Sequence, residues 1–246
     1  AGRPMVSITG TPPLGAGGRL AGTVRHVPAD DFRVAVYTHH AESGGWFNAA
    51  GFIQPLTEIE RDGAWAVTLP DNPRTHASDL VAVFLVPRGT DVPLVAGVPE
   101  LPIELFGQAS AHDGVERLHG GLRRLVFFSG FTWWVKGHVA PMGPGPNLFS
   151  DSQDNVWVDR DGRLHLRVTR RGDAWHCAEV VLRESPGYGA YLWTLDTPVH
   201  ALDPNIVLGL FTWSDAPDFA HREIDIEFAR WADPANENTQ FVVQPY

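Results

Sequence analysis

Apolar and polar residues alternate along most of this chain with a period of two, the pattern of β-strands that bury one face. We find no stretch that keeps the 3.6-residue period of a helix, so we predict an all-β protein. Turn-forming pairs, Asp62–Gly63 and Asp161–Gly162, separate predicted neighbouring strands. The main strands predicted in this way cover residues 5–9, 32–37, 65–69, 80–86, 125–128, 131–135, 155–159, 163–169, 175–182, 188–195, 206–213, 222–228 and 240–243.

The strand pattern also suggests how the chain divides into domains. Short strands with regular turn signals predict an immunoglobulin-like accessory β-sandwich over residues 1–107. Residues 108–121 are polar and follow a proline-rich stretch, so we predict a linker there. A second β domain is expected over residues 122–246, and it carries the candidate chemistry, because the first shows no catalytic constellation.

One predicted strand is unusually acidic. Glu223, Asp225 and Glu227 alternate with apolar residues near the end of the chain. Side chains two positions apart on a strand point the same way, so the three carboxyl groups should share one face. No Lys or Arg lies among them on that face, and Arg222 should fall on the opposite one.

Such a row of acids has two readings. Like charges that lie side by side push at least one pKa upward. A glycosidase uses this crowding, because one carboxyl group must stay ionised while another stays protonated near neutral pH. The alternative is a half-exposed strand with a solvated acidic face, since short motifs also arise by chance.

The flanking sequence favours the first reading. An aromatic strand, Leu208–Trp213, precedes the acids, and further matches lie upstream. With these flanks, Glu-Ile-Asp-Ile-Glu-Phe resembles the active-site strand of glycoside hydrolase family 16, which includes lichenases, laminarinases and xyloglucan-active enzymes. The resemblance covers about residues 122–246 and implies a concanavalin-like β-jelly-roll sandwich. The upstream matches are Asn147–Asp151, Asn155–Asp159, Gly162–Arg167 and Gly187–Gly189.

The resemblance implies a retaining mechanism and a role for each acid. Glu223 would be the nucleophile, Glu227 the general acid/base, and Asp225 would hydrogen-bond the nucleophile and tune the pair. A retaining enzyme needs two carboxyl groups about 5 Å apart. Cα atoms four residues apart on a strand are roughly 13 Å apart, so the two Glu side chains must lean toward each other over the shorter Asp.

Three further residues are candidate substrate contacts. Trp213 ends the preceding strand and could stack on a sugar ring, or it could pack in a core. Asn147 matches a family position near the cleft. Glu179 could also face the cleft, although a lone Glu on a strand is more often solvated. For His221 we favour an exposed strand end over a role as proton partner.

Composition and charge limit the classes of molecule that the protein is expected to bind. The net charge is −10, from 19 basic and 29 acidic residues, which argues against a nucleic-acid partner. No apolar run reaches membrane-spanning length, so we expect no membrane span. The nine Trp residues fit a carbohydrate partner, but aromatics also fill β-sandwich cores. Cys177 has no second cysteine with which to form a disulfide, so cysteine pattern says nothing of secretion.

We expect no required cofactor and assign no metal site. A structural calcium ion is common in the family that the chain resembles, but no dense Asp/Asn cluster in the sequence identifies one. The family's sandwich usually needs more residues than 122–246, and Gln240–Tyr246 looks like a strand cut short. We therefore expect either a fragment or a sandwich completed by a further segment or a second chain.

Two hypotheses follow. The first is a secreted, endo-acting hydrolase, or a transglycosylase, of a β-linked glucan or galactan. The second is a carbohydrate-binding protein on the same scaffold without turnover. The intact Glu223, Asp225 and Glu227 favour the enzyme, because a binding protein has no need to keep three acids on one face.

Overall fold

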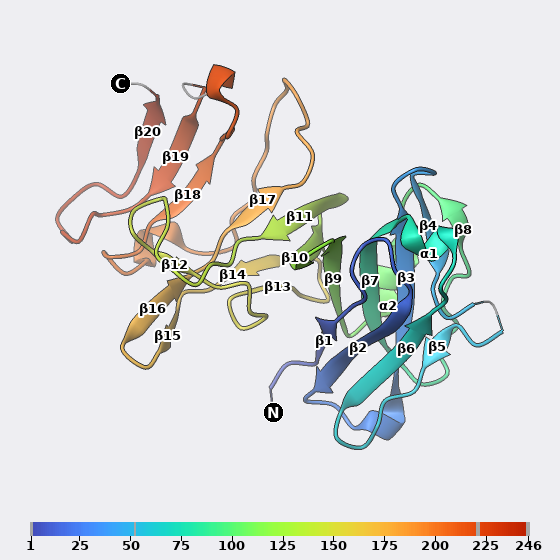
Figure 1. Cartoon of the computed structure of the whole chain (residues 1–246). Coiled ribbons are helices and arrows are strands. Elements are labelled where there is room, and N and C mark those ends of the chain that lie inside the picture. The colour runs from blue at the N-terminus through green and yellow to red at the C-terminus, as the bar shows by residue number, and fades with distance from the viewer. Residues whose placement is uncertain (1, 52, 220–221, 245–246) are drawn as a thin grey trace. The chain divides into compact units, whose positions relative to one another are not determined.

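The computed structural model describes residues 2–51, 53–219 and 222–244. Nearly all regular elements in these residues are β-strands, mostly in antiparallel sheets, which confirms the predicted all-β class (Figure 1). The chain divides into two compact units, Ala1–Ser185 and Pro186–Tyr246. No helix in the described ranges is long and apolar enough to cross a membrane.

The first unit begins with a three-stranded antiparallel sheet. It contains β1 (Met5–Gly10), β2 (Gly18–Arg25) and β6 (Ala64–Leu69), with β2 in the centre. Alternate residues such as Val6, Leu20 and Trp65 are buried, as the period-two pattern predicts. This sheet therefore presents one apolar face to the core.

The main sheet of the first unit has nine strands. Eight of them follow one path, β17-β11-β10-β9-β7-β3-β4-β8, and β5 pairs with β3 beside it. In sequence order the strands are β3 (Phe32–His40), β4 (Gly45–Asn48), β5 (Leu56–Thr57), β7 (Ser78–Pro87), β8 (Ala96–Val98), β9 (Ala111–Leu118), β10 (Gly121–Phe128), β11 (Phe131–Val135) and β17 (Val180–Leu182).

Apolar cores cover both faces of β7, which explains why that strand is an almost continuous apolar run. On one face Val81, Val83 and Leu85 pack with the inward side chains of the three-stranded sheet. On the other face Phe84 packs with Leu105 of the short helix α2 (Ile103–Gln108). The first unit is thus a sandwich whose large sheet is covered on both sides.

The predicted linker was wrong. Residues 111–118 form β9, which pairs with β7 on one side and with β10 on the other, inside the main sheet. β10, β11 and β17 continue this sheet, so most of residues 122–185 belong to the first compact unit rather than to a separate second domain. The polar character of the tract misled the prediction, because Asp113 and Arg117 within it are buried and paired.

Arg117 is the largest of these buried polar side chains, with 1% of its surface exposed. Its guanidinium donates five hydrogen bonds to backbone carbonyl oxygens. These carbonyls come from the loop after β1, from the segment before β7 and from the first residue of β7. Arg117 therefore satisfies backbone groups that the strands leave unpaired. Its partners are the carbonyls of Pro12, Pro13, Ala16, Thr75 and Ser78.

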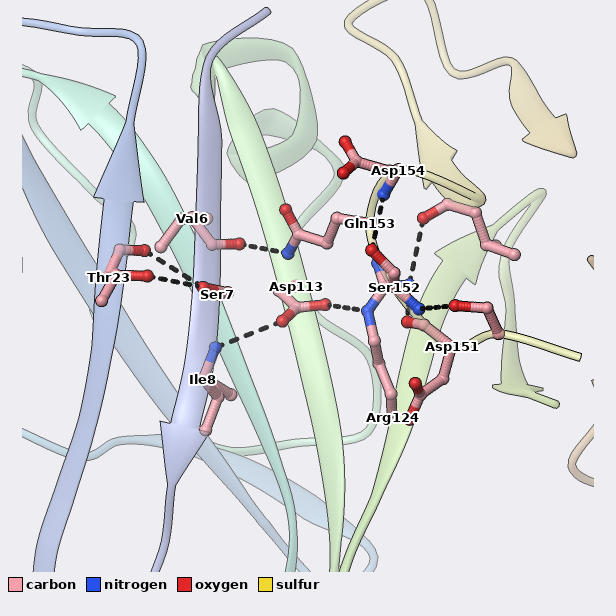
Figure 2. A network of polar contacts seen from close by, with 12 residues as sticks. Val6, Ser7, Ile8, Thr23, Asp113, Arg124, Asp151, Ser152, Gln153 and Asp154 are labelled. Carbon is pink, nitrogen blue, oxygen red and sulfur yellow. Dashed lines mark hydrogen bonds and ion pairs between the residues drawn. The ribbon is translucent and has the colours of Figure 1, made fainter. Parts of the chain in front are cut away.

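Asp113 of β9 forms a second buried polar link, shown in Figure 2. One of its carboxylate oxygens accepts a hydrogen bond from the Ile8 backbone N–H, at 3.3 Å. The other accepts from Nε of Arg124, at 2.8 Å. The exposed fractions of the Asp113 and Arg124 side chains are only 2% and 9%. A buried ion pair therefore joins β1, β9 and β10.

The same network fixes the loop that precedes β13 (Val156–Val158). Nη1 of Arg124 donates to the carbonyls of Asp151 and Val156, at 2.9 and 3.0 Å. The Gln153 side-chain amide donates to the Val6 carbonyl (Figure 2). Side-chain hydrogen bonds therefore join strand β1 to this distant loop, although the two do not pair as strands of one sheet.

Smaller sheets complete the first unit. β13 and β14 (Leu164–Leu166) form the predicted hairpin around Asp161–Gly162, where Gly162 has φ +77°. β15 (Thr169–Arg171), β16 (Ala174–Cys177) and β12 (Leu148–Phe149) form a three-stranded sheet in which β12 and β16 are parallel. The single strand predicted at 175–182 is two strands, β16 and β17, which belong to different sheets.

The second unit contains one three-stranded antiparallel sheet, with β19 (Ile224–Phe228) between β18 (Leu208–Phe211) and β20 (Gln240–Val243). The strand predicted at residues 188–195 does not form. Within the described part of this unit only Asp225 and Ala229 are buried. The sheet therefore carries most of its side chains on exposed or half-exposed surfaces.

Candidate active site

The acidic row predicted from the sequence lies on the central strand of the second unit's sheet. Asp225 and Glu227 belong to β19, and Glu223 precedes the strand directly. The Glu223 carbonyl accepts a hydrogen bond from the Gln244 backbone N–H at 2.9 Å, so the pairing with the β20 side continues past the strand's start. Strand alternation places Asp225 and Glu227 on one face, and Glu223 lies close enough to form a hydrogen bond with Asp225.

The register identifies what lies beside the acids on that face. Asp225 pairs with Phe211 of β18 and with Val242 of β20. Glu227 pairs with Gly209 and Gln240. Directly opposed residues of antiparallel strands share a face. The acidic face therefore combines carboxyl groups with an aromatic ring, an amide and a glycine that leaves room beside Glu227.

Trp213 lies two residues after the end of β18, at the same end of the sheet as Glu223. Thr212 extends the pairing, since its backbone N–H donates to the Ile224 carbonyl at 3.1 Å. The Trp213 indole N–H donates to Asp215 at 3.0 Å, and 63% of the residue's surface is exposed. The sequence left two roles open for Trp213, packing in a core or stacking on a sugar. Core packing is wrong, because the ring is exposed, and the ring remains available to stack on a sugar.

The acids differ in their surroundings. Asp225 is buried, with 8% of its surface exposed, while Glu223 and Glu227 are half-buried. The pKa of Glu223 is raised above its usual value. Burial is the main cause, followed by the charge of Asp225, a hydrogen bond between these two carboxyl groups, and the charge of Glu227. The crowding expected from the sequence thus acts on Glu223.

Glu227 has a partner that the sequence analysis missed. The Gln240 side-chain amide donates a hydrogen bond to a Glu227 carboxylate oxygen. The pairing of Gln240 with Glu227 across the two strands brings them together. The period-two pattern of residues 240–243 indicated a strand, but nothing in the sequence fixed its register against the acids.

Among the described residues, no Lys or Arg forms an ion pair with Glu223, Asp225 or Glu227. The Arg222 guanidinium lies 4.3 Å from the centre of the Phe219 ring, which is consistent with its predicted place off the acidic face. His221 lies outside the described residues.

The other two candidate substrate contacts belong to the first unit, where each has partners of its own. Nζ of Lys136 lies 2.9 Å from both carboxylate oxygens of Glu179, and the Lys136 backbone N–H donates to the Glu179 carbonyl at 3.0 Å. Glu179 is therefore a paired acid that connects two segments.

Asn147 closes the Gly/Pro-rich loop after β11. Its backbone exchanges two hydrogen bonds with Met142, and its side-chain amide donates to the Pro144 carbonyl at 2.8 Å. Lys136 also donates to the Gly143 carbonyl, at 2.6 Å. These contacts give Asn147 a structural role in shaping the loop. A substrate contact for Asn147 or Glu179 stays a prediction.

The described residues hold no group of three or more His, Cys, Asp or Glu side chains arranged to bind a metal ion. Comparison of the chain with protein-family models, with curated proteins and with solved structures found no match. The case for a function therefore rests on the sequence motif and on the chemistry of the acidic face.

Proposed function

We propose that the protein is an endo-acting, retaining glycoside hydrolase of a β-linked polysaccharide, a β-glucan or a galactan. The observation that carries the proposal is the acidic face of β19, where two glutamates flank a buried aspartate and the pKa of Glu223 is raised. The resemblance to glycoside hydrolase family 16 supplies the reaction class. A concanavalin-like jelly roll around this strand, after an immunoglobulin-like first sandwich, belongs to the same proposal.

In the proposed first step the Glu223 carboxylate attacks the anomeric carbon, and the Glu227 carboxylic acid protonates the oxygen that leaves. The glycosidic C–O bond breaks as the bond from carbon to the Glu223 oxygen forms. In the second step Glu227, now ionised, takes a proton from water, and the water oxygen displaces Glu223 from the sugar. The configuration of the anomeric carbon is retained after two inversions.

Asp225 resolves an apparent conflict in this assignment. A nucleophile must be ionised, whereas burial and the neighbouring charges raise the pKa of Glu223. Because a hydrogen bond links Glu223 and Asp225, the two carboxyl groups can share one proton. When the proton lies on Asp225, Glu223 carries the negative charge and accepts a hydrogen bond that stabilises it. Asp225 is thereby a positioning residue that lets the nucleophile stay ionised.

The aromatic rings beside the acids suit a sugar. Phe211 and Trp213 have 41% and 63% of their surface exposed. Aromatic faces bind the apolar faces of sugar rings, and Gly209 leaves space near Glu227. The same exposure favours the second candidate, a carbohydrate-binding protein without turnover. Since polysaccharides of this kind lie outside cells, both candidates imply a secreted protein.

The test is release of reducing ends from β-1,3-, β-1,4- and mixed-linkage glucans and from galactans. It compares the chain with Glu223→Gln and with Glu237→Gln, a matched control that removes an exposed acid of the same unit. We expect activity on one polymer, loss of at least about a thousandfold in Glu223→Gln, and no change in the control. Binding of a polymer without turnover would favour the binding protein, and activity that survives Glu223→Gln would refute the mechanism.

A further inference from the structure

A cavity of about 150 Å³ lies at one end of the sandwich in the first unit. Its walls come from β3 and β4 of the main sheet, from the end of β6, and from the short helix α1 (Pro73–His76). Figure 1 shows α1 beside β3 and β4 at this end. An apolar cavity of about 150 Å³ is known to hold benzene, so there is room for a small organic molecule.

Three polar side chains in the wall of this cavity are more than nine-tenths buried. The exposed fractions of Thr38, His40 and Thr75 are 7%, 6% and 7%. No described residue forms a hydrogen bond with any of these three side chains. Buried polar groups normally have partners, because leaving them unpaired is unfavourable.

The polar atoms of these side chains are not enclosed on all sides. A few side-chain polar atoms in the structure are unpaired and have no access to solvent. The polar atoms of Thr38, His40 and Thr75 do not belong to this group, so they keep some access. All three residues line the cavity, so a molecule that enters it comes within reach of their free donors and acceptors. The partners left to these groups are solvent or a molecule bound in the cavity.

The charge of the residues that line the cavity indicates which molecules would bind there. Arg74 lies at the exposed side and forms no ion pair with any described residue. Its guanidinium carbon lies 5.0 Å from the centre of the Phe47 ring, which holds it in place. The described residues of the lining include no Asp or Glu. The cavity thus carries one uncompensated positive charge.

His40 adds to the donors. Its ring stacks on Phe47 with a centroid distance of 4.3 Å and an interplanar angle of 19°. Burial, and then the charge of Arg74, lowers the pKa of His40. Asp79 acts in the opposite sense, but that carboxylate pairs with His39 and Arg183. The neutral imidazole offers one N–H donor without repelling a cationic neighbour.

We propose that this cavity binds a small organic anion through a carboxylate or another oxyanion. Arg74 forms the ion pair, and the hydroxyls of Thr38 and Thr75 donate the further hydrogen bonds that an oxyanion accepts. Leu69 and Val95 supply an apolar wall for a short carbon skeleton. The site belongs to the first unit and does not depend on the function proposed for the acidic strand.

The test is titration of the whole chain with acetate, butyrate, glucuronate, inorganic phosphate and sulfate, followed by amide NMR shifts and calorimetry. We expect at least one of these anions to bind and to shift the amides of residues 38–49 and 72–77. The carboxylates and the inorganic ions are separate arms, so they distinguish an organic acid from a free inorganic anion. Binding of butanol as tight as that of butyrate would overturn the role of charge.

Matched variants complete the design. Arg74→Gln should weaken binding by about tenfold or more, because a charge-assisted hydrogen bond is lost. Thr38→Val with Thr75→Val keeps the shape of the wall, removes both hydroxyls, and should weaken binding as well. Arg61→Gln removes an exposed charge elsewhere in the unit and should leave binding unchanged. Equal losses in Arg61→Gln and Arg74→Gln, or no response to any anion, would refute the site. Circular dichroism confirms that each variant is folded.

Discussion

The side-chain amide of Gln240 donates a hydrogen bond to the carboxylate of Glu227 from the neighbouring strand. If Glu227 is the acid/base, this bond fixes the direction in which the carboxyl group points. We therefore expect Gln240→Leu to lower kcat by about tenfold and to leave KM almost unchanged, because small displacements of a catalytic group slow the chemical step. Steady-state kinetics on the preferred polymer measures both values. Thr239→Val, a neighbouring change that spares this bond, is the control.

Glu223→Gln should stabilise the protein near neutral pH although it removes activity. The pKa of Glu223 is raised above its usual value of 4.5, so the folded state holds this proton more tightly than the unfolded state. Stability contributed by the group is present below pH 4.5 and is lost as the pH rises through the raised pKa. The gain in Glu223→Gln is on the order of 0.5 kcal/mol, because solvent screens a half-exposed group.

Urea unfolding followed from pH 4 to pH 7 provides the measurement for this second prediction. The stabilisation in Glu223→Gln should increase as the pH rises, because the wild-type carboxyl group then loses its proton. If Glu223→Gln were less stable than wild type at pH 7, the charged Glu223 carboxylate would not be destabilising, and the prediction would be contradicted. Glu237→Gln should show no such dependence on pH.

Arg124→Leu should be strongly destabilising. It leaves the Asp113 carboxylate buried without its cation, and it also frees the carbonyls of Asp151 and Val156. Breaking a buried ion pair from one side typically costs about 3–5 kcal/mol. The double variant Asp113→Asn with Arg124→Leu should recover part of this loss, because no uncompensated charge remains. Denaturant unfolding of the four proteins in this cycle tests the coupling, and strictly additive effects would disprove it.

His112 should make the first unit sensitive to acid. Burial lowers the pKa of His112 from its usual value of 6.5 to about 4, and its Nε2 atom is buried without a hydrogen bond. The unfolded state therefore binds this proton first as the pH falls. Stability is complete above pH 6.5 and declines between pH 6.5 and about 4, by up to roughly 3 kcal/mol.

A comparison with His112→Phe isolates this effect. The ring of Phe fits the cluster that His112 forms with Phe84, Phe106 and Phe127. Over the same pH range the raised pKa of Asp113 acts in the opposite sense in both proteins, so it cancels in the comparison. We expect the variant to lose less stability than wild type between pH 7 and pH 4. Parallel pH profiles of the unfolding free energy would exclude His112 as the cause.

The sequence was a good guide wherever an element depends on its own residues. The alternation of acidic and apolar residues around Asp225 and Glu227 correctly predicted a strand, which the structure has as β19 (Ile224–Phe228). The turn at Asp161–Gly162 was likewise predicted correctly, because Gly162 adopts a positive φ that glycine accommodates readily. Local patterns of this kind need no information from distant parts of the chain.

Predictions from the sequence were wrong or incomplete where the structure of a segment depends on residues far away in the chain. Residues 108–121 read as a linker, since Asp113 and Arg117 are polar, yet partners more than a hundred positions away bury both side chains. Similarly, residues 188–195 are mostly apolar and were predicted to be a strand, but they pair with no strand among the described residues. The partner of Glu227 depends on the register of β20, which period-two patterning leaves open.

The thin burial of the second unit has a consequence for how its amide hydrogens exchange with solvent. Of its described residues only Asp225 and Ala229 are buried, whereas β7 in the first unit has apolar cores on both faces. Local opening requires little energy where few apolar contacts are lost. Amides of β18, β19 and β20 should therefore exchange with deuterium at opening free energies well below those of β7. Any molecule that settles over the acids would slow this exchange, so deuterium uptake in β19 is a direct gauge of occupancy at the candidate site.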